Sequence, residues 1–111
     1  MASRRKPRPD DNASNLHRER ALCLDAQCTL REGQALKAVL AEALDLGGDV
    51  AMDGAGVQRI DTAGLQLLVA FTRALAAEGR QWRWIASSAE LRDTASQLGL
   101  QGGLGLQAAS P

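Results

Sequence analysis

The most apolar stretch of the chain has helical periodicity and lies between two short apolar segments. Its leucines, Val69 and Phe71 occupy more than half of the circumference of a helix that runs from residue 65 to Glu78. Such a helix must be buried on most of its sides. Residues 49–53 precede it and residues 81–86 follow it, and both segments have the length and composition of strands. The chain therefore alternates strands and helices, which predicts an α/β fold.

The preceding part of the chain repeats this order. Residues 21–28 alternate apolar and polar side chains around a break, which predicts one or two short strands. Thr29 and Glu32 have the spacing of a capping box, so a helix is expected to begin there. Gly47-Gly48 ends this helix, because a left-handed residue is needed at that point. Strand, helix and strand joined by short links imply parallel pairing.

The C-terminal third predicts one more strand and one more helix. Residues 81–86 place two tryptophans on one face of a strand, where we interpret them as core side chains under a helix. Ser87 begins a second capping box, and the helix that it opens is expected to end at Gly99. Leucines alternate with glycines in residues 100–106, which we expect to be a loose end of the domain.

Length and charge divide the chain into a basic tail and one domain. Residues 1–20 combine charge, proline and little apolar content, which predicts a disordered basic tail. Residues 21–106 are expected to form the domain, and residues 107–111 a C-terminal tail. The 13 basic and 13 acidic side chains balance overall, but residues 21–111 hold only 7 basic and 10 acidic ones. This mildly acidic part argues against binding of nucleic acid.

Several classes of protein are disfavoured by the residue types present. Cys23 and Cys28 match no zinc or redox spacing, so both are expected to be reduced thiols in a cytoplasmic protein. No apolar run approaches the ~20 residues of a membrane span. His17 is the only histidine and lies in the tail, and no nucleophile and base are paired elsewhere. We therefore expect no enzyme, no metal site and no cofactor.

One motif at the start of the most apolar helix combines an acid, a hydroxyl and a glycine. It reads Ile60-Asp61-Thr62-Ala63-Gly64-Leu65. Backbone N–H groups at a helix N-terminus point outward and favour a negative group. A simpler interpretation is that Asp61 or Thr62 caps the helix while Gly64 relieves crowding.

From Ala21 to about Leu100 the sequence resembles a STAS domain, the fold of bacterial anti-sigma-factor antagonists. The resemblance is carried by Val50-Ala51-Met52-Asp53, Val57, the motif at residues 60–65 and Gly79. It implies a small mixed β-sheet of about four strands with helices mainly on one face. It also implies that the protein has no bound metal and acts by docking to another protein through the loop at residues 60–65.

In that family a partner kinase phosphorylates the hydroxyl residue directly before the glycine, and phosphorylation breaks the complex. Ala63 occupies this position here, so the remaining hydroxyl, Thr62, is expected to be the phosphoacceptor or a partner contact. The implied partner is an anti-sigma-factor kinase. The alternative is a constitutive binding subunit without phosphorylation, whose partner is a lipid-transporter ATPase or a chemotaxis or histidine-kinase system.

Overall fold

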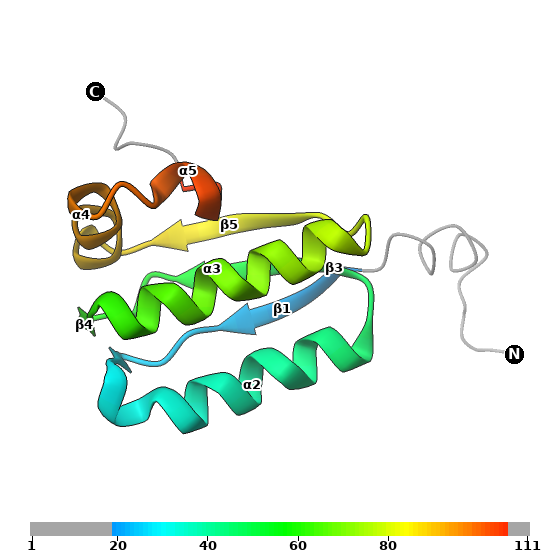
Figure 1. The fold of residues 1–111 in the computed structure, drawn as a ribbon, viewed down its shortest axis with the longest axis horizontal. Coiled ribbons are helices and arrows are strands. Elements are labelled where there is room, and N and C mark those ends of the chain that lie inside the picture. The colour runs from blue at the N-terminus through cyan, green and yellow to red at the C-terminus, as the bar shows by residue number, and fades with distance from the viewer. Residues whose placement is uncertain (1–18, 107–111) are drawn as a thin grey trace, which may run out of the picture.

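The computed structural model describes residues 19–106, in which strands and helices alternate along the chain (Figure 1). The predicted tails at 1–18 and 107–111 lie outside the described residues. The elements are β1 (Glu19–Cys23), β2 (Gln27–Cys28), the 3₁₀ turn η1 (Leu30–Glu32), α2 (Gly33–Leu46), β3 (Asp49–Gly54), β4 (Arg59–Ile60), α3 (Thr62–Ala77), β5 (Trp82–Ser87), α4 (Ala89–Gln97) and α5 (Gln101–Leu104).

The central sheet has three strands in the order β1-β3-β5, and both pairings are parallel. The two short strands β2 and β4 form a second, separate parallel ladder. Within residues 19–106 the sheet is therefore parallel, and the expectation of a mixed sheet is wrong for this part of the chain. The physical reason lies in the connections: α2 links β1 to β3 and α3 links β3 to β5, and each helix returns the chain to the end where the previous strand began.

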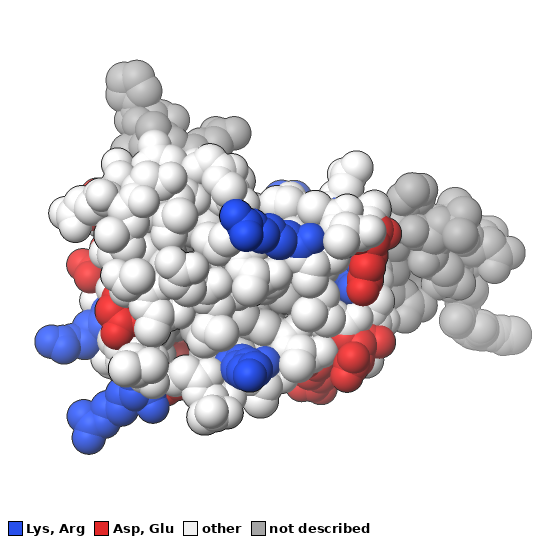
Figure 2. Space-filling model, in the orientation of Figure 1, with Lys and Arg blue, Asp and Glu red and all other residues white. Residues whose placement is uncertain are grey.

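The helices cover one face of the central sheet, as expected. Val50 and Met52 of β3 are fully buried on that face, and the partners of these residues in β5 are Trp82 and Trp84. α2 and α3 lie side by side over the sheet (Figure 1). Their outer surface is largely uncharged in the view of Figure 2. The opposite face of the sheet exposes side chains such as Cys23.

The predicted helix boundaries are confirmed with small shifts. Glu32 accepts hydrogen bonds from the backbone N–H of Thr29 at 3.2 Å and from its hydroxyl at 2.6 Å, and the first turn after this box is 3₁₀ rather than α. Gly47 and Gly48 have φ values of 76° and 87°, which end α2 where a residue with a side chain would be strained. β1 begins at Glu19, two residues inside the segment assigned to the tail.

The cap of α4 is displaced by one residue from the predicted position. Ser88, not Ser87, is the N-cap, and its Oγ accepts a hydrogen bond from the N–H of Leu91 at 3.1 Å. Ser87 is the last residue of β5, because its backbone continues the pairing with Gly54.

The segment at residues 100–106 packs into the core, so the expectation of a loose end is wrong. Leu104 is fully buried and Leu106 is 6% exposed. The carbonyl oxygen of Leu104 accepts hydrogen bonds from the indole N–H groups of Trp82 and Trp84, both at 2.9 Å. Both indoles are partly buried against the core, where their N–H groups need an acceptor, and α5 supplies it from the helix side of the sheet.

No helix between residues 19 and 106 has the length and apolar character needed to cross a bilayer.

Candidate functional site

Asp61 is the N-cap of α3 and joins two elements. Its Oδ1 accepts a hydrogen bond from the N–H of Gly64, and its Oδ2 accepts one from the N–H of Leu30 in η1, both at 2.9 Å. These two N–H groups, that of Leu30 first, lower the pKa of the Asp61 carboxyl below its usual value. The capping interpretation of Asp61 is therefore confirmed, and the same carboxylate holds η1 against the start of α3.

Three residues of the motif belong to the core. Ile60 is 6% exposed, Leu65 is fully buried and Gly64 is buried. A Cβ atom on Gly64 would lie 1.9 Å from the carbonyl oxygen of Cys28, so the first turn of α3 touches the backbone of β2. The predicted role of Gly64 in relieving crowding is confirmed. These three residues anchor the motif, and their side chains offer little surface to a partner.

Thr62 and Ala63 form the accessible part of the motif. Thr62 is the first residue of α3 and is exposed, while Ala63 is half-buried. Leu30 lies next to them, because Asp61 binds its N–H, and 73% of this large apolar residue is exposed. We call Leu30, Thr62 and Ala63 the α3 docking patch. Sequence reasoning missed Leu30, since it is 32 residues before Thr62 and is part of the capping box at Thr29.

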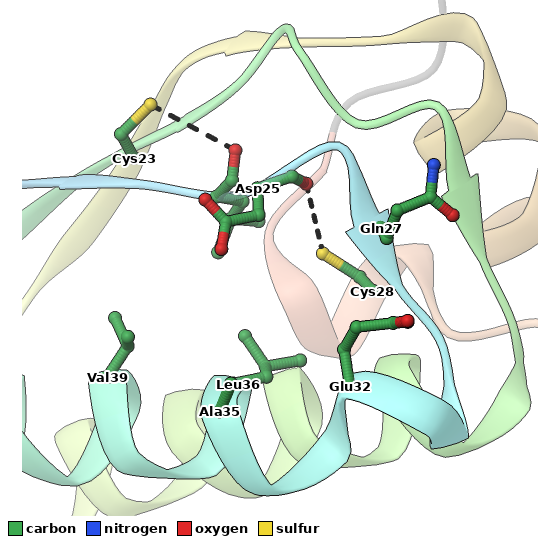
Figure 3. A pocket seen from close by; sticks show the side chains of 9 residues that line it. Cys23, Asp25, Gln27, Cys28, Glu32, Ala35, Leu36 and Val39 are labelled. Atoms are coloured by element: carbon green, nitrogen blue, oxygen red, sulfur yellow. Dashed lines mark hydrogen bonds between the residues drawn. The ribbon is translucent and has the colours of Figure 1, made fainter.

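A hollow of about 90 Å³ lies between the end of β1 and the start of α2 (Figure 3). A site for a drug-sized molecule typically has about 300–1,000 Å³, so this hollow is too small for one. Its lining residues are Cys23, Leu24, Asp25, Gln27, Cys28, Glu32, Ala35, Leu36 and Val39.

The two cysteines of the hollow are free thiols in different settings. Cys28 is buried and its Sγ donates to the carbonyl oxygen of Asp25 at 3.3 Å. Burial, followed by the carboxylates of Asp25 and Glu32, raises the pKa of this thiol to about 11. Cys28 is therefore protonated near neutral pH and is a poor nucleophile. Cys23 is exposed.

The acids close to the motif serve as backbone acceptors. Asp53 accepts a hydrogen bond from the N–H of Ala55 at 3.0 Å, which stabilises the turn after β3, while Asp61 caps α3. Across the described residues, no three His, Cys, Asp or Glu side chains are grouped as metal ligands would be.

Comparisons with known proteins leave the family open. No model of a known protein family matches the sequence, and no curated protein matches it. The observed fold is a compact α/β arrangement with a small parallel sheet, whereas the assignment to the STAS family depends on the motif and the order of elements.

Proposed function

We propose that this protein is a non-enzymatic regulator of the STAS type that binds a partner protein through the α3 docking patch. One observation carries the proposal: Thr62 is exposed at the first turn of α3 beside Leu30, 73% of which is exposed. Monomeric proteins expose single leucines routinely. Here the Asp61 carboxylate fixes the backbone of Leu30 at the start of α3, so that an exposed apolar residue is held close to the motif.

The rigidity of the patch favours binding. Asp61 accepts hydrogen bonds from the backbone of both η1 and α3, and Gly64 brings α3 against β2. The backbone of Thr62 and Leu30 is therefore positioned before a partner arrives. A preorganised surface loses little conformational entropy on association. Full burial of the Leu30 side chain would contribute about 1.5–3 kcal/mol.

Phosphorylation of Thr62 would act as the switch. A phosphoryl group there adds about −1.5 to −2 charge. The N-terminus of α3 favours that charge, while the neighbouring Asp61 carboxylate repels it. We expect the domain to stay folded and the changed surface to expel a partner that covers the patch. The partner in this reading is an anti-sigma-factor kinase.

The constitutive alternative has its own supporting observation. Ala63, which is half-buried, occupies the position of the usual phosphoacceptor and has no hydroxyl. In this reading Thr62 donates a hydrogen bond to a transporter ATPase or to a histidine-kinase system. Loss of that bond would cost about 1–3 kcal/mol if the contact is buried.

Mapping of phosphorylated residues distinguishes the phosphorylation switch from constitutive binding. The purified protein is incubated with a kinase of the anti-sigma-factor class and ATP, and the modified residue is identified by mass spectrometry. The switch predicts a label on Thr62 that Thr62→Ser retains and Thr62→Ala abolishes. Absence of label, or a label confined to other residues, rules out the switch and leaves the constitutive reading.

A comparison of two leucine variants tests the patch itself. Leu30→Ser is compared with Leu98→Ser, because Leu98 is also exposed (42%) but lies at the end of α4. A partner recovered with the wild-type protein from its own cells should bind Leu30→Ser about tenfold more weakly, which corresponds to about 1.4 kcal/mol. It should bind Leu98→Ser unchanged. Equal recovery with both variants and with Thr62→Glu would remove the patch from the interface.

A further inference from the structure

An apolar groove opens to solvent between α2 and α3. Its volume is about 210 Å³, and its lining is almost entirely aliphatic and aromatic. Figure 2 shows that the surface over these two helices is largely uncharged. The lining residues are Lys37, Leu40, Ala41, Leu44, Leu67, Ala70 and Phe71.

Two charged residues on the exposed side of α2 lie at equal distances along the helix from Ala41, which lines the groove. Lys37 lines the groove four residues before Ala41, and the exposed Asp45 follows Ala41 by four residues. Eight residues of helix span about 12 Å, so the two charges are too far apart to form a close ion pair within one chain. In an antiparallel arrangement of two α2 helices centred on Ala41, each lysine meets the aspartate of the other copy.

We propose that the groove is a self-association surface, on which a second copy of this chain packs its α2 and α3 antiparallel to the first. The twofold axis crosses the helices next to Ala41 and Ala70, and the same patch serves both copies. Two pairs between Lys37 of one copy and Asp45 of the other fix the antiparallel direction. The residues involved lie outside the α3 docking patch.

The small residues at the centre allow the two copies to approach. Ala41 and Ala70 are both exposed and both line the groove, and each is the ninth residue of its helix. α2 and α3 run in the same direction, since each connects parallel strands. Both alanines line the same groove, so helices can pack there at short interaxial distance. The half-buried Leu44 and Leu67 become covered on association.

The charge pattern indicates a second copy rather than a different helix. A helix face with a lysine four residues before Ala41 and an exposed aspartate four residues after it is complementary to itself on reversal. Helices of 14 and 16 residues present a face of roughly 20 Å by 20 Å, or about 400 Å² per copy. A standard interface buries about 800 Å² per partner, so the dimer is expected to be weak and concentration-dependent.

Charge reversal with rescue tests the proposal. Sedimentation equilibrium on the full chain, from micromolar to submillimolar concentration, should show a reversible monomer–dimer equilibrium. Lys37→Glu or Asp45→Lys alone should weaken dimerisation about tenfold, because each places two like-charge pairs in the dimer. The double variant Lys37→Glu/Asp45→Lys restores both pairs and should return the dissociation constant to within about threefold of wild type.

A matched control separates this effect from a change in net charge. Glu42 is exposed on α2 but lies outside the i, i+4 row formed by Lys37, Ala41 and Asp45, so Glu42→Lys should leave dimerisation unchanged. Ala41→Glu should abolish the dimer while circular dichroism shows an intact fold, since Ala41 is exposed. A wild-type protein that remains monomeric throughout, or a double variant no better than either single one, overturns the proposal.

Discussion

Gly64 belongs to the motif at residues 60–65 and also allows α3 to pack against β2. The first turn of α3 lies so close to β2 that a methyl group at Gly64 would overlap the carbonyl oxygen of Cys28. Backbone cannot yield as a flexible side chain can. The glycine is therefore required by packing and not by its dihedral angles, because it is not among the glycines with positive φ.

Gly64→Ala should lower the free energy of unfolding by at least about 3 kcal/mol, measured by urea denaturation, because overpacking against backbone forces the helix away from the sheet. Gly33→Ala is the matched control. Gly33 is helical, with φ of −57°, and nothing lies within 4 Å of an added Cβ. That change should raise the free energy of unfolding by about 0.5–1 kcal/mol. Equal effects of the two changes would contradict the close contact.

The two thiols should differ in reactivity towards iodoacetamide. Burial and the raised pKa of about 11 keep Cys28 protonated at pH 7.5, while Cys23 is exposed. We expect Cys23 to be alkylated at least tenfold faster in the folded protein, as followed by mass spectrometry. In urea the two rates should converge. Equal rates in the folded protein would show that the hollow opens readily to solvent.

At the scale of elements, Arg80 connects the end of α2 to the start of β5. Its side chain is 9% exposed, and its guanidinium donates to the carbonyl oxygens of Gly48 at 2.6 Å, Leu44 at 3.0 Å and Ala43 at 3.1 Å. It also pairs with Glu78 at 2.7 Å. The positive charge lies at the negative end of the α2 dipole and satisfies carbonyls that the helix leaves unpaired.

Arg80→Ala should lower the free energy of unfolding by about 1.5–3 kcal/mol, because several buried carbonyls lose a charged donor. Arg80→Lys should recover only part of this loss, since an ammonium group lacks the planar fork of donors. Urea denaturation measures both. Arg73→Ala is the control, because Arg73 is exposed on α3 and its removal should change stability by less than about 0.5 kcal/mol.

At the scale of the whole molecule, stability should depend on pH through three carboxylates. The pKa of Glu19 is lowered chiefly by its hydrogen bond from Arg83, that of Glu32 by the Thr29 hydroxyl, and that of Asp61 by backbone N–H groups. The Glu19 carboxylate links β1 to β5, the Glu32 carboxylate stabilises the turn before α2, and the Asp61 carboxylate caps α3. A carboxyl whose pKa is lower in the folded state stabilises the protein when ionised.

The free energy of unfolding should therefore be nearly constant from pH 7 to about 5 and fall as the pH drops below about 4, the usual carboxyl pKa. Urea denaturation over a pH series measures this dependence. Asp61→Asn should flatten the acidic limb, because it removes one of the titrating groups. A stability that rises on acidification would contradict the lowered pKa values.

Local patterns in the sequence determined the elements of this protein, whereas contacts between distant residues determined its site and its topology. Periodicity, the Thr29 box and Gly47-Gly48 predicted strands and helices close to their observed bounds, since these signals act within a few residues. The order of strands and helices also predicted parallel pairing, whereas the strand order β1-β3-β5 and the burial of residues 100–106 follow from tertiary packing. The carbonyl of Leu104 is needed as an acceptor only once two indoles, 20 and 22 residues earlier, pack against the core beside it.

The motif at residues 60–65 divides in the same way. Its helix-capping chemistry is local, so Asp61 could be predicted as a cap from sequence. The tertiary structure decided two further contacts: Gly64 touches Cys28, and Asp61 binds Leu30 across 31 residues. Both contacts require β2 and η1 to pack against α3. The same packing leaves Thr62 exposed beside Leu30 and buries Ile60 and Leu65.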